Sequence, residues 1–206
     1  MNDKEFYKLI KITEASTKNE VVNFFNDCFE KEKVRVQVAK YDTSLPSNQR
    51  SINAYIGFEQ FALLTADLIT GRLIKKIEEA MPNGGYSLGY GGTPESFWYN
   101  GKPESRIITL GISKNKDKIY INVVRTQGVT TDTGAIKPDN NRDTSTDCKI
   151  SVGVDLEKFR SMFIYTQKYI DAFTVPFGNN KYKEGKAEKD RRKKNNESTN
   201  VEPENM

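Results

Sequence analysis

The sequence predicts an α+β protein in which helices cover one face of an antiparallel β-sheet. Three observations predict this class. Several short runs alternate apolar and polar residues, as strands with one buried face do. Two of these runs continue directly into segments with apolar residues every three or four positions, which is the spacing of amphipathic helices. Another two runs flank a short polar turn, which indicates an antiparallel hairpin.

The first expected element is a helix over 14–31. Its apolar residues share one stripe at helical spacing: Val21, Phe24, Phe25, Cys28 and Phe29. We therefore expect residues 1–33 to form an N-terminal helical segment. A strand follows over 34–42, where Val34, Val36 and Val38 point to one side and polar or small residues to the other.

The stretch 51–80 begins with strand alternation and changes to helical spacing after Phe58. Gly71 is expected to kink this helix or to mark a close approach, and the run from Pro82 to Gly85 ends it. The segments "SRIITLGIS" and "KIYINVVRTQ" flank "KNKD" and predict the hairpin. Residues 127–147 are rich in Thr, Asp, Asn and Gly and are expected to form a loop, and 148–173 is again a strand followed by a helix.

Residues 84–101, "GGYSLGYGGTPESFWYNG", combine many glycines with many aromatic rings. The first part, 84–92, is typical of an irregular or extended segment, and it would bring Tyr86 and Tyr90 beside the sheet. The second part is bounded by prolines and suggests a hairpin that carries Trp98, the single tryptophan of the chain.

A weak internal repeat relates the two strand–helix segments at an offset of 98 residues. "INAYIGFEQFALL" (52–64) aligns with "ISVGVDLEKFRSM" (150–162) in identity or character at seven positions. Any strand that turns into a helix with a Glu near its start would look similar, so the two interpretations remain open. A real repeat predicts a pseudo-symmetric pair of units whose helices leave one sheet face open.

The residues predicted on that open face are polar, small or lightly basic, and three of them are tyrosines. They include Arg35, Gln37, Asn53, Thr109, Asn122, Ser151 and Gly153 together with the rings Tyr41, Tyr55 and Tyr120. Small residues beside rings leave room for bases to stack, each worth about 1–3 kcal/mol, while basic groups hold phosphates. A solvent face and a subunit contact are the alternative interpretations.

This layout resembles the Whirly and positive-cofactor-type single-strand-binding proteins. The resemblance lies in "INAYIGFEQFALL", "ISVGVDLEKFRSM" and the hairpin over 106–125, and it concerns topology over 34–173. It implies repeated units of strands and a helix, a sheet that holds single-stranded DNA or RNA, and oligomerisation through helices. An OB-type barrel is an alternative fold that would keep the nucleic-acid interpretation.

Composition argues against several other classes. The chain contains no histidine, and its two cysteines are far apart, so the commonest general base and a zinc site are missing. We expect no enzyme, no cofactor and no metal. The cysteines are expected to be reduced thiols in a cytoplasmic protein, and no run of 18 apolar residues predicts a membrane span.

The C-terminal residues 177–206 differ from the rest of the chain. They carry eight basic and six acidic residues and little apolar character, which predicts a disordered charged tail after a domain over 34–176. The tail therefore has a net charge of +2, and because the whole chain has +4, only +2 remains for residues 1–176, which are nearly neutral. The Lys-, Asn- and Ile-rich composition is compatible with an AT-rich genome, such as that of a plasmid or phage.

The sequence therefore predicts a homo-oligomeric protein that binds single-stranded DNA with little sequence preference, and RNA would fit the same surface. The expected contacts are Arg35, Tyr41, Tyr55, Tyr86, Tyr90, Trp98, Tyr120, Arg125 and Lys149. Arg125 is included because we expect it to end its strand, where side-chain alternation is loose. The alternative function is a protein–protein interaction module that docks its aromatic segment on a partner.

Overall fold

The structure is a computed structural model that describes residues 10–92 and 101–175. The chain divides into two compact units, 1–167 and 168–206, and everything described below up to residue 167 belongs to the first. Trp98 and the predicted tail therefore lie outside the described residues.

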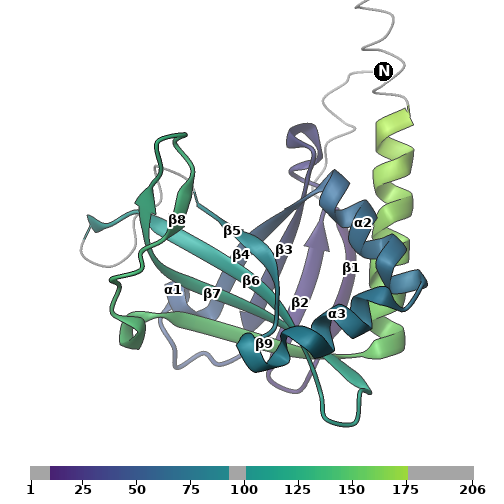
Figure 1. The fold of residues 1–206 in the computed structure, drawn as a ribbon, viewed down its shortest axis with the longest axis horizontal. Coiled ribbons are helices and arrows are strands. Elements are labelled where there is room, and N and C mark those ends of the chain that lie inside the picture. The colour runs from purple at the N-terminus through teal and green to yellow at the C-terminus, as the bar shows by residue number, and fades with distance from the viewer. Residues whose placement is uncertain (1–9, 93–100, 176–206) are drawn as a thin grey trace, which may run out of the picture. The chain divides into compact units, whose positions relative to one another are not determined.

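The first sheet, sheet A, is a four-stranded antiparallel meander (Figure 1). Its strands follow each other in chain order: β1 (Lys11–Ser16), β2 (Glu20–Phe25), β3 (Lys33–Lys40) and β4 (Ser51–Gly57). The strand predicted over 34–42 is confirmed, with its three valines fully buried. A short helix, α1 (Ser47–Arg50), precedes β4.

The predicted helix over 14–31, and with it the N-terminal helical segment, is wrong. Thr17 and Glu20 close a tight turn between β1 and β2, where the Thr17 amide donates to the Glu20 carbonyl at 2.7 Å. Four consecutive residues of β2, Val21–Phe24, are buried, so this strand is covered on both faces. A strand of this kind loses its polar alternation, and its apolar run can be mistaken for a helical stripe.

Two helices follow sheet A: α2 (Phe58–Ile69) and α3 (Arg72–Ala80). Gly71 separates them with a φ of +75°, in the left-handed region that favours glycine. A Cβ atom at Gly71 would meet nothing within 4 Å, so the backbone conformation, and not close packing, explains the glycine. A 3₁₀ turn, η3 (Met81–Asn83), ends this helical region as predicted.

Sheet B is also antiparallel and is built around the predicted hairpin. Its strands are β5 (Tyr86–Gly91), β6 (Glu104–Ile112), β7 (Lys118–Thr130), β8 (Ile136–Pro138) and β9 (Cys148–Asp155). Strands β5, β6, β7 and β9 pair in that spatial order, and β8 pairs with the far end of β7. The expected loop over 127–147 therefore contains the end of β7 and the short β8, besides turns.

The structure bears out the repeat. Strand β4 ends at Gly57 and α2 begins at Phe58, whereas β9 ends at Asp155 and the C-terminal helix (156–175) begins at the next residue. These junctions are 98 residues apart, which is the predicted offset. Each repeat thus has four antiparallel strands in meander order followed by a helix, and the second repeat adds the short β8 between β7 and β9. Phe61 and Phe159 are fully buried at equivalent positions.

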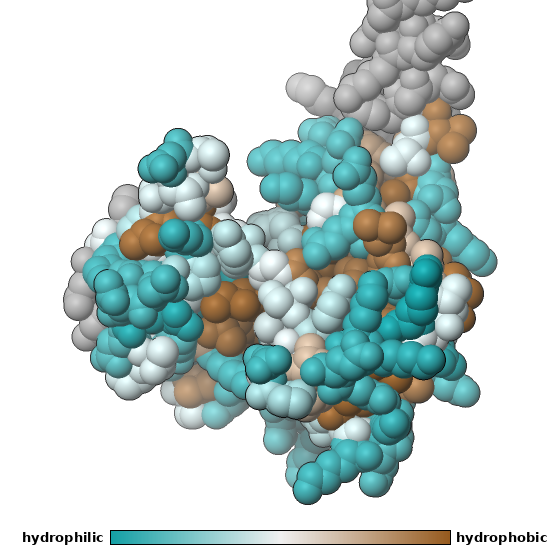
Figure 2. Space-filling model, viewed as in Figure 1, coloured by the Kyte–Doolittle hydropathy of each residue, from teal (hydrophilic) through white to brown (hydrophobic). Residues whose placement is uncertain are grey.

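Within residues 1–167, aromatic side chains join the two repeats in the core. Phe61 of α2 stacks on Phe163 of the C-terminal helix with ring centroids 4.7 Å apart, and Phe24 of β2 meets both rings edge-on. On the side shown in Figure 2 the surface is largely hydrophilic, and apolar side chains interrupt it over α2, where Leu63 and Ile69 are exposed.

The α+β class is therefore confirmed, with one correction. The strands form two antiparallel sheets instead of one, because the two repeated units each build their own. No helix in the described ranges is long and apolar enough to cross a membrane.

Candidate functional site

Two edge strands, β4 of sheet A and β5 of sheet B, approach each other without pairing. Among the described strands, β4 pairs with β3 and β5 pairs with β6. A cleft of about 290 Å³ opens between them. We call it the β4–β5 cleft, and it is lined by Cys28, Lys31, Lys33, Ala54, Tyr55, Gln60, Leu88–Gly92, Arg106 and Ile108.

The charge of this lining has one sign. Lys31, Lys33 and Arg106 contribute three cations, and no Asp or Glu is among the described residues that line the cleft. Arg106 is held by Glu104, whose Oε1 lies 2.5 Å from the Arg106 Nε, so part of its charge is compensated. Lys31 and Lys33 are exposed. The lining of the cleft is therefore basic, although residues 1–176 as a whole are nearly neutral.

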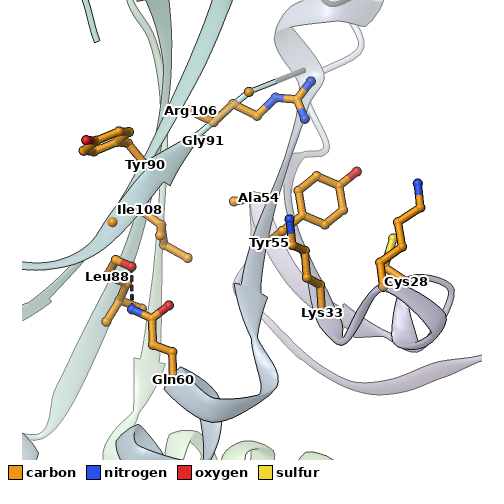
Figure 3. Close-up of a pocket in the computed structure, with 13 residues that line it drawn as sticks. Cys28, Lys33, Ala54, Tyr55, Gln60, Leu88, Tyr90, Gly91, Arg106 and Ile108 are labelled. Atoms are coloured by element: carbon orange, nitrogen blue, oxygen red, sulfur yellow. Dashed lines mark hydrogen bonds between the residues drawn. The ribbon is translucent and has the colours of Figure 1, made fainter. Parts of the chain in front are cut away.

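The lining is also divided into a polar end and an apolar end (Figure 3). The Lys33 amine, the Tyr55 hydroxyl and the Arg106 guanidinium lie toward one end of the view. Leu88, Ile108 and the amide of Gln60 lie toward the other. A ligand that carries both an anion and a flat apolar ring would match this arrangement.

Glycine forms most of one wall. Gly89 and Gly91 belong to β5, and a Cβ atom at either position would meet nothing within 4 Å. Gly89 has a φ of +113°, which few other residues adopt, whereas the φ of Gly91 is not positive. At these two positions the β5 wall of the cleft thus presents backbone in place of side chains. Tyr55 lies on the opposite strand, β4, with its ring directed away from β5 (Figure 3), and it is 41% exposed.

The orientation of Gln60 is fixed by β5. Its Nε2 donates a hydrogen bond to the Leu88 carbonyl oxygen at 2.6 Å. The Oε1 atom is turned to the opposite side, toward the cleft (Figure 3). The amide therefore offers an acceptor at the apolar end of the site.

Cys28 adds a thiol to the lining. Burial, followed by the nearby Asp27 carboxylate, raises the pKa of this thiol above its ordinary value. Arg35, Lys31 and Lys33 oppose the shift but do not outweigh it. At neutral pH the side chain is therefore a neutral thiol and does not reduce the positive charge of the cleft.

The open face of sheet A borders the cleft at Tyr55. Across this face Asn23, Gln37 and Asn53 are register partners on neighbouring strands and form a row of amides, in which Asn23 is buried and the other two are half-buried. The next row contains Phe25, Arg35 and Tyr55. The Cζ atom of Arg35 lies 4.2 Å from the centroid of the Phe25 ring. The Arg35 Nε donates a hydrogen bond to Asp27 Oδ1 at 2.9 Å, and its Nη1 donates one to Asn53 Oδ1 at 3.2 Å.

The corresponding face of sheet B has a similar polar row. Ser87, Thr109, Asn122 and Ser151 are register partners, and Ser151 donates to Asn122 at 2.6 Å. Tyr120 lies against the backbone of Gly153, because a Cβ there would come within 3.0 Å of the Tyr120 ring. The space that the small residue was expected to leave for a base is thus filled by the protein's own ring.

The structure brings some of the predicted contacts together. Tyr55 and Tyr90 both line the cleft, although the Tyr90 ring points away from Tyr55 (Figure 3). Arg35 is the register partner of Tyr55, but its side chain is only 14% exposed and already paired with Asp27. Lys149 lies on the open face of sheet B, in the same cross-strand row as Tyr90.

Other predicted contacts lie elsewhere. Tyr41 follows β3 and lines a separate hollow with Glu20 and Asp42. Tyr86 is half-buried opposite Leu110, on the core side of sheet B. Arg125 does not end its strand, since β7 continues to Thr130, and that expectation is wrong. The Arg125 side chain is 12% exposed, and its Nη1 lies 3.9 Å from the Oε2 of Glu104.

Sequence reasoning missed Lys31, Lys33, Gln60 and Arg106. The two lysines fell at or beside the end of the wrongly predicted helix. Arg106 alternates with Ile108 and Leu110, so its place on the core side could have been read from the strand pattern. Nothing in the sequence indicated that β4 and β5 would meet, because unpaired edges leave no periodic signal.

Comparison of the chain with protein-family models, with curated proteins and with solved structures gives no match. Within the described ranges, no group of three or more Cys, Asp or Glu residues is arranged to hold a metal ion.

Proposed function

We propose that the protein binds single-stranded nucleic acid, with DNA as the expected form, and with little sequence preference. The observation that carries this proposal is the convergence of Tyr55, Lys31, Lys33 and Arg106 on one cleft whose described lining has no carboxylate. The strand would continue from the cleft over the polar face of sheet A along β4 and β3, where Asn53 and Gln37 are half-buried, and not over β2, where Asn23 is buried.

Stacking and charge together account for such binding. A base stacked on an aromatic ring is worth about 1–3 kcal/mol, and any base can stack because every base has a π-face. Lys31 and Lys33 would pair with phosphates and release counterions. A cleft of about 290 Å³ has room for a single base and not for a duplex, so it would admit only unpaired bases.

The resemblance to the Whirly and positive-cofactor-type families is part of this proposal. Two units, each of four antiparallel strands followed by a helix, support it at the level of topology. The free thiols Cys28 and Cys148 support a reducing, cytoplasmic location, and an origin on a plasmid or phage rests on composition alone.

A second proposal is that the chain self-associates through α2. The exposed side of this helix carries Ala62, Leu63, Ala66 and Ile69, and Leu63 and Ile69 are 69% and 66% exposed. Apolar residues at this spacing form one stripe on a helix, and such a stripe is typical of a protein contact. Sedimentation velocity over a range of protein concentrations tests this; a monomer at every concentration would contradict it.

Fluorescence anisotropy with labelled oligothymidylate and a labelled duplex, each across a salt series, tests the main proposal. We expect the full chain to bind the single strand in the micromolar range or tighter at low salt, and more tightly than the duplex. Tyr55→Ala should weaken binding by about 5- to 150-fold, the equivalent of one stacked base. Tyr41→Ala is the matched control, because Tyr41 is also exposed but lies beside Glu20 and Asp42.

Two results would contradict the proposal. One is no detectable binding of the single strand at low salt. The other is equal affinity for single strand and duplex together with no effect of Tyr55→Ala, which would indicate charge attraction by the chain in general.

A further inference from the structure

We propose that the β4–β5 cleft receives one unstacked base of the bound strand and that Gln60 reads its Watson–Crick edge. This inference rests on the proposed function and goes beyond it. It names Gln60 as the residue that positions the base. It also explains how a protein that binds without sequence preference could distinguish unpaired bases from paired ones.

The polarity of the cleft sets the direction of the nucleotide. The cations Lys33 and Arg106 lie toward one end together with the Tyr55 hydroxyl, and this end suits the phosphate. Leu88 and Ile108 lie toward the other end and suit the base. The base would lie against the backbone of Gly89 and Gly91, where no side chain blocks it, and the Tyr55 ring would stack on a base at the mouth of the cleft.

Gln60 lies at the end where the outer edge of that base would arrive. Its Nε2 is engaged with the Leu88 carbonyl at 2.6 Å, so the amide cannot rotate freely. Its Oε1 is turned into the cleft, and no described residue donates a hydrogen bond to this atom. A fixed acceptor at this place suits a ligand that carries an N–H donor.

All four natural bases carry such a donor on the Watson–Crick edge. In thymine and guanine it is a ring N–H, and in adenine and cytosine it is the exocyclic amino group. In a duplex these donors are occupied by the partner strand. One acceptor therefore selects an unpaired base without selecting among the four, and unstacked bases are read on this edge in many complexes.

The pseudo-equivalent position supplies a matched control. In the second repeat, 98 residues later, the position of Gln60 is occupied by Lys158. Lys158 lines a hollow of about 310 Å³ between β9 and β1. The two residues therefore occupy corresponding places at the two contacts between the sheets. A substitution at Lys158 changes a side chain of similar length in a similar setting, away from the β4–β5 cleft.

The test compares oligothymidylate with the same strand carrying N3-methylthymine, which lacks the ring N–H. Anisotropy should show the methylated strand binding wild-type protein about three- to tenfold more weakly, the value of one neutral hydrogen bond. Gln60→Met keeps the length of the side chain and removes the acceptor. It should bind both strands equally, whereas Lys158→Met should keep the wild-type difference.

Gly91→Val provides a second test of whether a base enters the cleft, and it leaves the Gln60 hydrogen bond to Leu88 in place. The new side chain would point into open space in the cleft, at a position whose backbone tolerates it. We expect weaker binding of both strands and no difference between them.

The outcomes separate this inference from the proposed function. If wild-type protein binds both strands equally, or if the difference persists in Gln60→Met as a steric effect of the methyl group would, the inference is overturned and the proposed function stands. If wild-type protein binds neither strand, both are overturned.

Discussion

At the β4–β5 cleft, strand β4 and helix α2 face strand β5, and at the β9–β1 hollow, strand β9 and the C-terminal helix face strand β1. The two sites are related by the internal repeat, and their volumes are similar, about 290 and 310 Å³. Their side chains differ. The cleft has Tyr55 and Gln60 where the hollow has Gly153 and Lys158.

Charge separates the two sites further. Glu14 and Asp155 line the hollow with Lys158, whereas the described lining of the cleft has three cations and no carboxylate. The repeat thus supplies two equivalent places, and the side chains make one of them suitable for a polyanion with flat rings. Backbone equivalence therefore does not imply equivalent function.

The largest expected effect concerns the core that both units share. Phe61→Ala and Phe159→Ala each remove a fully buried ring at equivalent positions. Each should lower the free energy of unfolding by about 3–5 kcal/mol, from lost burial and the cavity left behind. Urea denaturation measures this change. A loss below about 1 kcal/mol for one of them would show that the repeated units do not contribute alike.

A smaller effect is expected from the lysines of the cleft. Lys31→Gln and Lys33→Gln should each reduce the slope of log affinity against log salt by about 0.7, because each removes one phosphate contact to a single strand. The measurement is anisotropy with oligothymidylate at several salt concentrations. Lys158→Gln is the control at the β9–β1 hollow, and its slope should match wild type. Equal changes for all three variants would contradict a functional difference between the two sites.

Much of the fold could be predicted where one face of an element is buried. The alternation in 34–38 and the change of period after Phe58 gave β3, β4 and α2 near their observed bounds. The offset of 98 residues was visible because both junctions repeat the same sequence of apolar positions. Strand β2 was missed for the opposite reason, since burial of both its faces removes the alternation.

The candidate site was predicted less well than the fold. Tyr55 and Tyr90 were expected on an exposed surface, and both line the cleft. Gln60 and Arg106 gave no signal as site residues, because their roles depend on two edge strands from different units meeting. Arg35 was expected to be available to phosphate, but its neighbours Asp27, Phe25 and Asn53 already engage it.

Photo-crosslinking tests the central claim most directly, because it locates a bound strand on the chain. An oligothymidylate that carries 5-iodouracil at each position would be irradiated with the full-length protein, and the crosslinked peptides would be identified by mass spectrometry. We predict crosslinks to Tyr55, with weaker ones to Tyr90, and their loss from Tyr55 in excess unlabelled strand. Crosslinks confined to the β9–β1 hollow or to residues 177–206 would contradict a single-strand site in the β4–β5 cleft.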